Sequence, residues 1–407
     1  MSEINVTSEY KTLRKVLVHR PGAETENLTP STYEELLFDD SYYLADAQKE
    51  HDTFVKVLRD NDVEVVYLED LVTETLDISE KIKDDFINEF VHEANVSPES
   101  KLFPVVVKYL KSFKDTKEMV VKAMAGVRYS ELGLDGNDIH SLSEVAAKDE
   151  LFVLKPMPNL IFTRDPFSTI VHGISLHTMH FETRKRETLF AEYIFKFHPD
   201  YKGTKQYYSR NRSSSLEGGD VMVLKEDEIA VGISQRSEAA SHEKLANAIF
   251  ADPESKIRTI WAINIPKGRS WMHLDTVFTQ IDIDKFSVFT DYDFNIFKIT
   301  KTDGKNPKIE EFKYSIADLM EKVFGQKVTL IYCGNNDPLI REREQWNDGS
   351  NVLAIKPNTV ITYTRNYVTN KALRDHGVNV IDINSGELSR GRGGPRCMSM
   401  PLIRDEK

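Results

Sequence analysis

Short apolar runs that predict strands alternate with helical patterns in the first part of the chain. The run Leu13–Val18 is largely apolar, and it ends at the turn residues Arg20-Pro21-Gly22. Thr29 before Pro30 is typical of a helix start, and a helical pattern follows from Tyr42 to Asn61. The partly alternating run Val63–Tyr67 comes next. This order predicts a strand, a helix and a second strand.

The pattern then becomes helical for about seventy residues. Apolar side chains recur at every fourth position, at Ile78, Ile82, Phe86 and Phe90. Asp115 followed by Glu118 resembles a capping box, and Gly126 is a plausible helix stop. We therefore expect a helical insertion at 74–147 within a body formed by 1–73 and 148–407.

Short strand patterns return after the insertion and continue to the C-terminus. They lie at Leu160–Thr163, Ile174–Phe181, Val221–Leu224, Ile229–Ile233, Ile257–Ile265, His273–Gln280, Val328–Tyr332, Val360–Tyr363 and Val378–Ile383. No repeated sequence period, long Gly/Ser linker or low-complexity tract is present. Many short strands with helices between them predict an α/β protein built from repeated small units.

Composition and charge narrow the class of protein. Of the 407 residues, 40% are hydrophobic and 29% are charged, which excludes global disorder. Lys and Arg total 53 against 65 Asp and Glu, and the resulting net charge of −12 argues against a nucleic-acid or anionic-membrane binder. No apolar run is long enough to span a membrane, and the N-terminal residues do not resemble a signal peptide. Two cysteines form no disulfide framework, so we expect a cytoplasmic location.

The segment Gly391–Cys397 is the most unusual local feature. Three glycines and a proline predict a loop that brings backbone close to a ligand. Arg392 and Arg396 flank Cys397, and neighbouring positive charge favours the nucleophilic thiolate. A lone cysteine is more often a small buried apolar residue, and we interpret Cys333, at the end of a predicted strand, in that way.

Three further segments carry acidic or imidazole side chains. His273 and Asp275 are two residues apart on a predicted strand, so we expect both side chains on one face. An imidazole beside a carboxylate can transfer protons, and a structural ion pair is the equally plain alternative. Glu217 precedes a Gly-Gly turn, which taken alone favours a polar hairpin. Asp165 ends a predicted strand before a proline, a position suited to face a cleft, although many strands end so.

Cofactor and metal motifs are absent from the sequence. The histidines at 172, 177 and 180 lack a second ligand cluster, and no Walker loop or dinucleotide GxGxxG is present. The single RGG-like stretch at Arg390 is not repeated as in RNA-binding tails. None of these patterns indicates a zinc, nucleotide or RNA-binding site.

Taken together, the chain resembles the arginine deiminases of the guanidine-modifying superfamily. The matching stretches are Val16–Gly22, Leu36–Asp40, Asn159–Phe167, Leu216–Asp220, Met272–Thr279 and Gly391–Arg404, in family order along nearly the whole chain. The resemblance implies a five-fold pseudosymmetric α/β propeller of the pentein type with an inserted helical domain. It also implies conversion of L-arginine and water to L-citrulline and ammonia without a metal or an organic cofactor, and a homo-oligomer.

The resemblance further assigns roles to individual residues. Cys397 would be the nucleophile, His273 the general acid and base, Glu217 its partner, and Asp165 and Asp275 would pair with the guanidinium of the substrate. The predicted substrate pocket consists of Arg184, Arg236, Arg392, Asn159, Leu37, Phe162 and Gly391. The three arginines would bind the α-carboxylate; without the resemblance, Arg184 would be interpreted as part of a solvated charge run.

Three alternatives remain open at this point. An agmatine deiminase would not need the arginine clamp, and an amidinotransferase would pass the amidino group to an amine. A non-catalytic propeller scaffold is a third alternative, but it would have no use for the five candidate catalytic residues. Assays for citrulline release with different substrates distinguish these functions.

Overall fold

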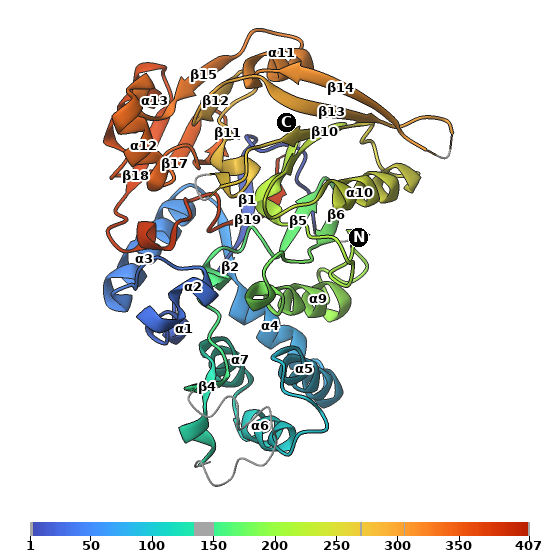
Figure 1. Ribbon diagram of the computed structural model, residues 1–407, viewed down its shortest axis with the longest axis vertical. Coiled ribbons are helices and arrows are strands. Elements are labelled where there is room, and N and C mark those ends of the chain that lie inside the picture. The colour runs from blue at the N-terminus through green and yellow to red at the C-terminus, as the bar shows by residue number, and fades with distance from the viewer. Residues whose placement is uncertain (1–2, 134–149, 269–270, 305, 406–407) are drawn as a thin grey trace.

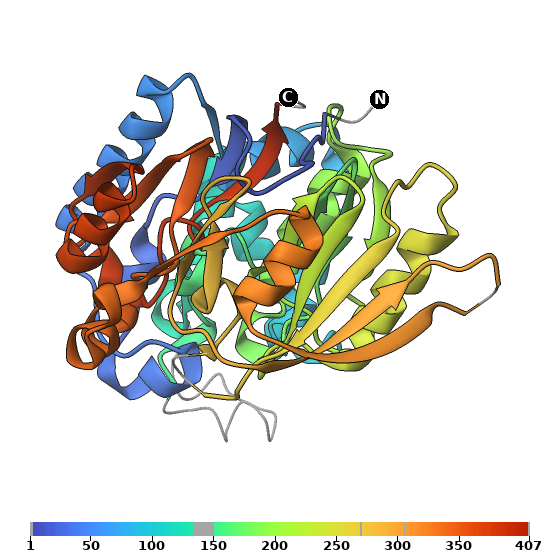
Figure 2. The ribbon, with the colours of Figure 1, turned by 90° about the horizontal axis from the view of Figure 1, so that it is seen from above.

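The computed structural model describes residues 3–133, 150–268, 271–304 and 306–405. Figure 1 shows a body of several small sheets, with helices α4 to α7 gathered at one end of it. A hairpin of β13 and β14 extends from the opposite part of the body, and Figure 2 shows it projecting to one side. The two ends of the chain meet, because β1 pairs with β19 in antiparallel fashion.

The strands are β1 (Leu13–Val18), β2 (Glu64–Tyr67), β3 (Val127–Arg128), β4 (Phe152–Leu154), β5 (Phe167–Ile170), β6 (Gly173–Leu176), β7 (Lys205–Tyr208), β8 (Val221–Lys225), β9 (Glu228–Ile233), β10 (Thr259–Asn264), β11 (Phe278–Gln280), β12 (Lys285–Val288), β13 (Phe294–Thr300), β14 (Lys308–Tyr314), β15 (Thr329–Tyr332), β16 (Leu353–Lys356), β17 (Thr359–Tyr363), β18 (Asn379–Ile383) and β19 (Met400–Arg404). The helices are α1 (Ala23–Glu26), α2 (Tyr33–Leu36), α3 (Leu44–Asp60), α4 (Leu68–Leu76), α5 (Glu80–Glu93), α6 (Leu102–Lys111), α7 (Thr116–Ala125), α9 (Glu187–Phe197), α10 (Ala239–Ala251), α11 (Ile316–Phe324), α12 (Pro338–Trp346) and α13 (Tyr367–Asp375).

Five of the sheets in the described ranges share one pattern. In each, a strand pairs antiparallel with the next, which pairs parallel with a third strand that follows a helix. These sets are β19-β1-β2, β5-β6-β7, β8-β9-β10, β11-β12-β15 and β16-β17-β18. The first set takes its opening strand from the C-terminal end of the chain. The predicted repetition of small β/α units is therefore confirmed, although no sequence period reveals it.

The helices α4 to α7 share their apolar core with the body. Phe86 of α5 lies between Phe190 and Tyr193 of α9, with ring centroids 5.7 and 5.1 Å apart. Each such aromatic pair contributes about 0.5–1.5 kcal/mol beyond the burial of its area. The predicted N-cap of α7 is confirmed, because the side chain of Asp115 accepts a hydrogen bond from the Glu118 amide, and Gly126 follows its last residue.

Most predicted strands and the long helix are confirmed within one or two residues at each end, but three predicted strands are wrong in whole or part. Leu160 and Ile161 end a 3₁₀ turn, Pro158–Ile161, because the proline favours a helical start over a ladder position, and the two residues that follow are not in a strand. The run from Ile174 is extended only to Leu176. His273–Gln280 contains a 3₁₀ turn, Leu274–Thr276, before β11 begins.

No helix in the described ranges is long and apolar enough to cross a membrane. The end of the predicted insertion, near 147, lies outside the described residues.

Candidate active site

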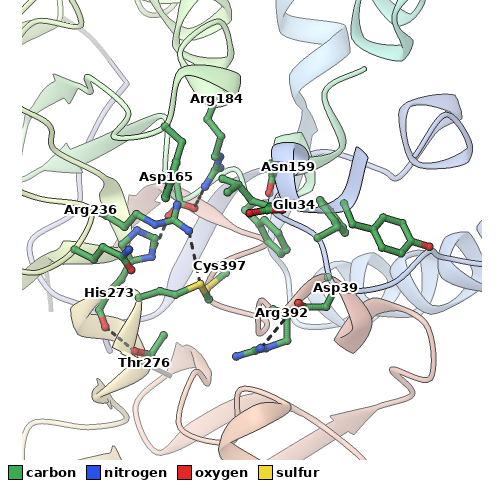
Figure 3. A pocket seen from close by; sticks show the side chains of 18 of the residues that line it. Glu34, Asp39, Asn159, Asp165, Arg184, Arg236, His273, Thr276, Arg392 and Cys397 are labelled. Atoms are coloured by element: carbon green, nitrogen blue, oxygen red, sulfur yellow. Dashed lines mark hydrogen bonds and ion pairs between the residues drawn. The ribbon is translucent and has the colours of Figure 1, made fainter. Parts of the chain in front are cut away.

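The predicted catalytic residues come from different sheets and meet at one place because each lies just before the opening strand of its set. Cys397 precedes β19, Asp165 precedes β5, Glu217 precedes β8, and both His273 and Asp275 precede β11. Their side chains are all buried, although they are far apart in the sequence. Figure 3 shows Asp165, His273 and Cys397 together around one pocket.

The Gly-Gly turn after Glu217 allows His273 to approach closely. A Cβ atom on Gly219 would lie 2.5 Å from Cγ of the His273 ring, which is closer than real Cβ contacts. Asp220, at the end of the same turn, accepts a 2.8 Å hydrogen bond from the Leu274 amide and so fixes the backbone beside the imidazole. The turn therefore positions His273, and the interpretation of Glu217 and its Gly-Gly turn as only a polar hairpin is incomplete.

His273 is held as an acid between carboxylates. Its Nε2 atom is 2.8 Å from Oε2 of Glu217, and its Nδ1 atom is 4.0 Å from Oδ1 of Asp165. Burial alone would lower the pKa of His273, but Asp165, Glu217 and Asp220 outweigh it and raise the pKa to about 9. Since Nε2 is used by Glu217, Nδ1 is the atom that faces a reacting group.

Glu217 is fully buried and stays ionised. Burial would raise its pKa, but the guanidinium of Arg236, followed by His273 and Arg184, holds the pKa well below its usual range. Its Oε1 atom accepts a 3.0 Å hydrogen bond from the His180 amide. A permanently charged Glu217 favours the imidazolium form of His273.

Asp165 and Asp275 each have one carboxylate oxygen with a hydrogen-bond partner and one without. Oδ2 of Asp165 accepts a 2.8 Å hydrogen bond from Arg184, and Oδ2 of Asp275 accepts one of the same length from Arg396. The Oδ1 atom of each is buried without a hydrogen-bond partner among the described residues. A buried carboxylate oxygen is costly to leave unpaired, so both oxygens are suited to N–H donors of a ligand.

Cys397 lies beside these carboxylates, with its Sγ atom 3.6 Å from Oδ2 of Asp275. Burial, followed by the charges of Asp275 and Asp165, raises the pKa of the thiol well above its usual value. The prediction that the flanking arginines favour the thiolate is therefore wrong for the unliganded protein. Arg396 is bound to Asp275 and Glu9 instead, and the guanidinium of Arg392 lies over the Trp346 ring and beside Asp39. The prediction for Cys333 agrees with the structure, since burial raises its pKa to about 12.

The three arginines predicted to bind a carboxylate line the same cavity of about 640 Å³ as Cys397, but each has an acidic neighbour. Arg184 contacts Asp165 and Glu187, and Arg236 lies 3.4 Å from Glu217. Arg392 has a left-handed backbone conformation with φ of 62°, its guanidinium stacks on the Trp346 ring, and Nη1 lies 3.4 Å from Asp39. Figure 3 shows Arg184 beside Asp165 and Arg392 beside Asp39.

The four other predicted pocket residues, Leu37, Asn159, Phe162 and Gly391, also line this cavity. Leu37 has a left-handed backbone with φ of 64°, which costs a residue with a Cβ about 1–2 kcal/mol. Asn159 donates a 2.8 Å hydrogen bond to the carbonyl of Leu36, the residue before Leu37, and so supports this loop. A Cβ atom on Gly391 would collide with the Tyr42 hydroxyl, which explains the glycine.

Asp165, Glu217 and His273 also form a cluster in which one ligand atom of each lies close enough to hold a metal ion. Each carboxylate is already bound to a guanidinium, and the imidazole is bound to Glu217. Cationic partners at the donor atoms favour a proton-transfer set over a cation site.

Sequence reasoning missed the buried residues that support these groups. Arg396 was interpreted only as a neighbour of the thiol, yet it joins Asp275 to Glu9. Asn351 received no role, yet it contacts both the Cys397 and the Asp275 backbone. A buried asparagine just before a strand carries no signal in a single sequence.

Comparison with solved structures supports the fold. The chain is similar to an amidinotransferase of the saxitoxin biosynthetic pathway from Microseira wollei, with a TM-score of 0.58, 15% identity and coverage of 100% of this chain and 98% of that one. Dimethylarginine dimethylaminohydrolase from Pseudomonas aeruginosa gives a TM-score of 0.51 at 13% identity, over 96% and 99% of the chains. At these identities the likeness shows a shared α/β fold.

Sequence comparisons are more specific. The family model for arginine deiminase matches residues 34–404. The chain is 48% identical to the arginine deiminase of Clostridium perfringens, covering 99% of this chain and 98% of that protein. It is 46% identical to the arginine deiminase of Treponema denticola, with both chains fully covered. The chain therefore belongs to the arginine deiminase family.

Proposed function

We propose that this protein hydrolyses L-arginine to L-citrulline and ammonia through an amidino adduct on Cys397. The observation that carries the proposal is the pair of unpaired carboxylate oxygens, one on Asp165 and one on Asp275, beside a buried thiol. A guanidinium supplies N–H donors in a planar arrangement that matches such acceptors. Family membership supports the same substrate.

The first half of the reaction forms the adduct. Binding of the cationic guanidinium favours loss of the Cys397 thiol proton to solvent. The resulting thiolate attacks the central guanidinium carbon, giving a tetrahedral intermediate whose C–S bond is new. Nδ1 of His273 gives its proton to one terminal nitrogen, which leaves as ammonia, and an amidino-thioether remains. Asp165 and Asp275 hold the guanidinium while this carbon is attacked, so the reaction gains mainly from orientation.

The second half of the reaction releases citrulline. His273, now neutral, takes a proton from a water molecule that attacks the same carbon. The C–S bond breaks and Cys397 leaves as a thiolate. The remaining hydroxyl proton passes to solvent, where it is taken up by the released ammonia, and the C=O bond completes the ureido group. Glu217 supports the imidazolium each time it forms, because it remains charged at 2.8 Å from Nε2.

The proposed clamp for the α-carboxylate consists of Arg184, Arg236 and Arg392, completed by Leu37, Asn159, Phe162 and Gly391. Support comes from their common position on the cavity that contains Cys397. Their present pairing with carboxylates means that arginine binding exchanges protein ion pairs for ion pairs with the substrate.

Agmatine, which lacks the α-carboxylate, is expected to be a poor substrate. Losing a charged hydrogen bond costs about 1.5–3 kcal/mol, and kcat/KM should therefore fall roughly 10²-fold relative to arginine. Arg392→Ala should lower kcat/KM for arginine by a similar factor and leave the low value for agmatine nearly unchanged. Citrulline and carbamoylputrescine are measured in parallel. Equal kcat/KM for both substrates would favour an agmatine deiminase.

Reagents that alkylate Cys397 should distinguish a thiol from a thiolate. Because burial and neighbouring carboxylates raise the thiol pKa, neutral iodoacetamide should react slowly at pH 7 and faster as the pH rises. The cationic reagent 2-chloroacetamidine should react faster at pH 7, since its amidinium binds Asp165 and Asp275 and favours the thiolate. Equal rates for both reagents at pH 7, after correction for their reactivity with a free thiol, would contradict this expectation.

The direct test of the proposed function is incubation of the purified protein with L-arginine, followed by colorimetric detection of citrulline and enzymatic detection of ammonia. Equal amounts of both products are expected. Well-folded protein that forms neither product would overturn the proposal.

We also propose that residues 1–73 and 148–407 form a pentein-type propeller with five-fold pseudosymmetry and that 74–147 is its helical insertion. The five sheets of common pattern support this arrangement. A homo-oligomer and a cytoplasmic location stay predictions.

A further inference from the structure

Four of the five sheet sets contribute catalytic side chains from the segment just before their opening strand, as described above. The fifth set opens with β16, and the residue in the corresponding segment is Asn351. Its side chain is fully buried. The repeated topology therefore places this asparagine where the other units carry the chemistry.

Asn351 connects the nucleophile with one of the guanidinium-binding carboxylates. Its Oδ1 atom accepts a 3.2 Å hydrogen bond from the backbone amide of Cys397. Its Nδ2 atom donates a 3.1 Å hydrogen bond to the backbone carbonyl of Asp275. An amide is suited to this position because one end must accept and the other must donate.

The loop that carries Asn351 is itself fixed to the Asp275 segment. The Ser350 hydroxyl and the Gln345 amide both donate to the carbonyl of Thr276, at 2.8 and 2.6 Å. On the other side, a Cβ atom on Gly394 would lie 2.5 Å from the Asn351 carbonyl oxygen, so the Cys397 loop packs directly on this residue. Asn351 has little freedom to move independently of either segment.

We infer that Asn351 is a positioning residue that sets the separation of the Cys397 thiol from Asp275, and thus from the guanidinium carbon. It touches neither the substrate nor the reacting atoms in the proposed mechanism. Its effect passes through the two backbone groups that it holds. The inference rests on the proposed function where it is tested by kcat. The effect of Asn351 on Cys397 can also be tested by alkylation, which needs no turnover.

Asn351→Leu has a similar size and removes both hydrogen bonds. We expect kcat to fall about 10²-fold, the loss that a small misplacement of reacting groups causes, with KM changed less than about threefold. Asn351→Asp is nearly the same shape and offers a sharper readout. Its ionised form has no donor for the Asp275 carbonyl, whereas its protonated form accepts and donates as the amide does. The ratio of its kcat to that of wild type should therefore rise as the pH falls, while the ratio for Asn351→Leu stays constant.

Ser350→Ala is the matched control, because Gln345 still donates to the Thr276 carbonyl after the hydroxyl is lost. Its kcat should stay within about threefold of wild type. Alkylation of Cys397 by 2-chloroacetamidine, followed by mass spectrometry, should rank the variants in the same order as kcat does. The ratio of each variant's alkylation rate to that of wild type should depend on pH as its kcat ratio does.

The outcomes separate this inference from the proposed function. Wild type that forms no citrulline while alkylation follows the expected trend would refute the function and support the positioning role. A folded Asn351→Leu protein with kcat within threefold of wild type would overturn the role. If Asn351→Leu fails to fold, an Asn351→Asp ratio that does not change with pH would overturn it equally.

Discussion

Replacing Cys397 by serine is expected to reduce citrulline formation by a factor on the order of 10⁴ or more, the scale seen when a catalytic nucleophile is removed. The site raises even the thiol pKa through burial and the charges of Asp275 and Asp165. A hydroxyl, whose pKa is far higher, would give no useful amount of anion there. The measurement is citrulline release per folded molecule, with acid-quenched wild type analysed for an amidino adduct on the Cys397 peptide.

Cys333→Ser is the matched control for this experiment. Cys333 is buried, and its Sγ atom contacts the Thr369 hydroxyl at 3.5 Å, remote from the proposed reaction. A serine at 333 should leave kcat within about twofold of wild type. An adduct found on Cys333, or an active Cys397→Ser enzyme, would show that the assignment of the nucleophile is wrong.

The secondary structure was predictable where one feature dominated the local sequence. The largely apolar run Leu13–Val18 and the β-branched run Val360–Tyr363 both lie in strands that are almost entirely buried. In the hairpin of β13 and β14, the strand Lys308–Tyr314 was missed because it is a polar edge strand in which no residue is buried. His273–Gln280 was misinterpreted because Asp220, which is distant in sequence, turns the backbone at Leu274.

The candidate site was predictable from the resemblance, whereas its electrostatics were not. The sequence places Arg392 and Arg396 beside Cys397, and this proximity suggested a thiolate. In three dimensions the charges that act most strongly on the sulfur are those of carboxylates, since Arg396 is bound to Asp275 and Glu9. The sign of a pKa shift depends on side-chain directions and on partners hundreds of residues away, which a single sequence does not contain.

The second large effect is expected for His273→Ala, because the proposed mechanism uses one imidazole in both halves of the reaction. Ammonia departure needs an acid near the C–N bond, and hydrolysis of the adduct needs a base near the same carbon. Losing both functions should lower kcat by about 10² to 10⁴, the span of general acid and base catalysis. Arginine should still bind, since Asp165, Asp275 and the proposed clamp remain.

Single-turnover kinetics should show that both adduct formation and adduct hydrolysis are slower in His273→Ala, and calorimetry should show a Kd near the wild-type value. Asp275→Ala is the comparison, because losing a guanidinium-binding carboxylate should weaken binding as well as turnover. A His273→Ala enzyme that slows only one step would assign the other proton transfer to a different group, with Glu217 the nearest alternative.

The pH dependence of the wild-type rate is an independent test of His273 as the general acid. Carboxylates raise the pKa of His273 to about 9, so its acid form dominates at pH 7 and is lost as the pH rises through that value. The rate constant for adduct formation should therefore fall on the alkaline side near pH 9, provided that bound substrate has already converted Cys397 to its thiolate. His273→Ala should lack this alkaline fall. If the variant retains it with the same midpoint, the proton for departing ammonia comes from another group, and the role proposed for His273 is wrong.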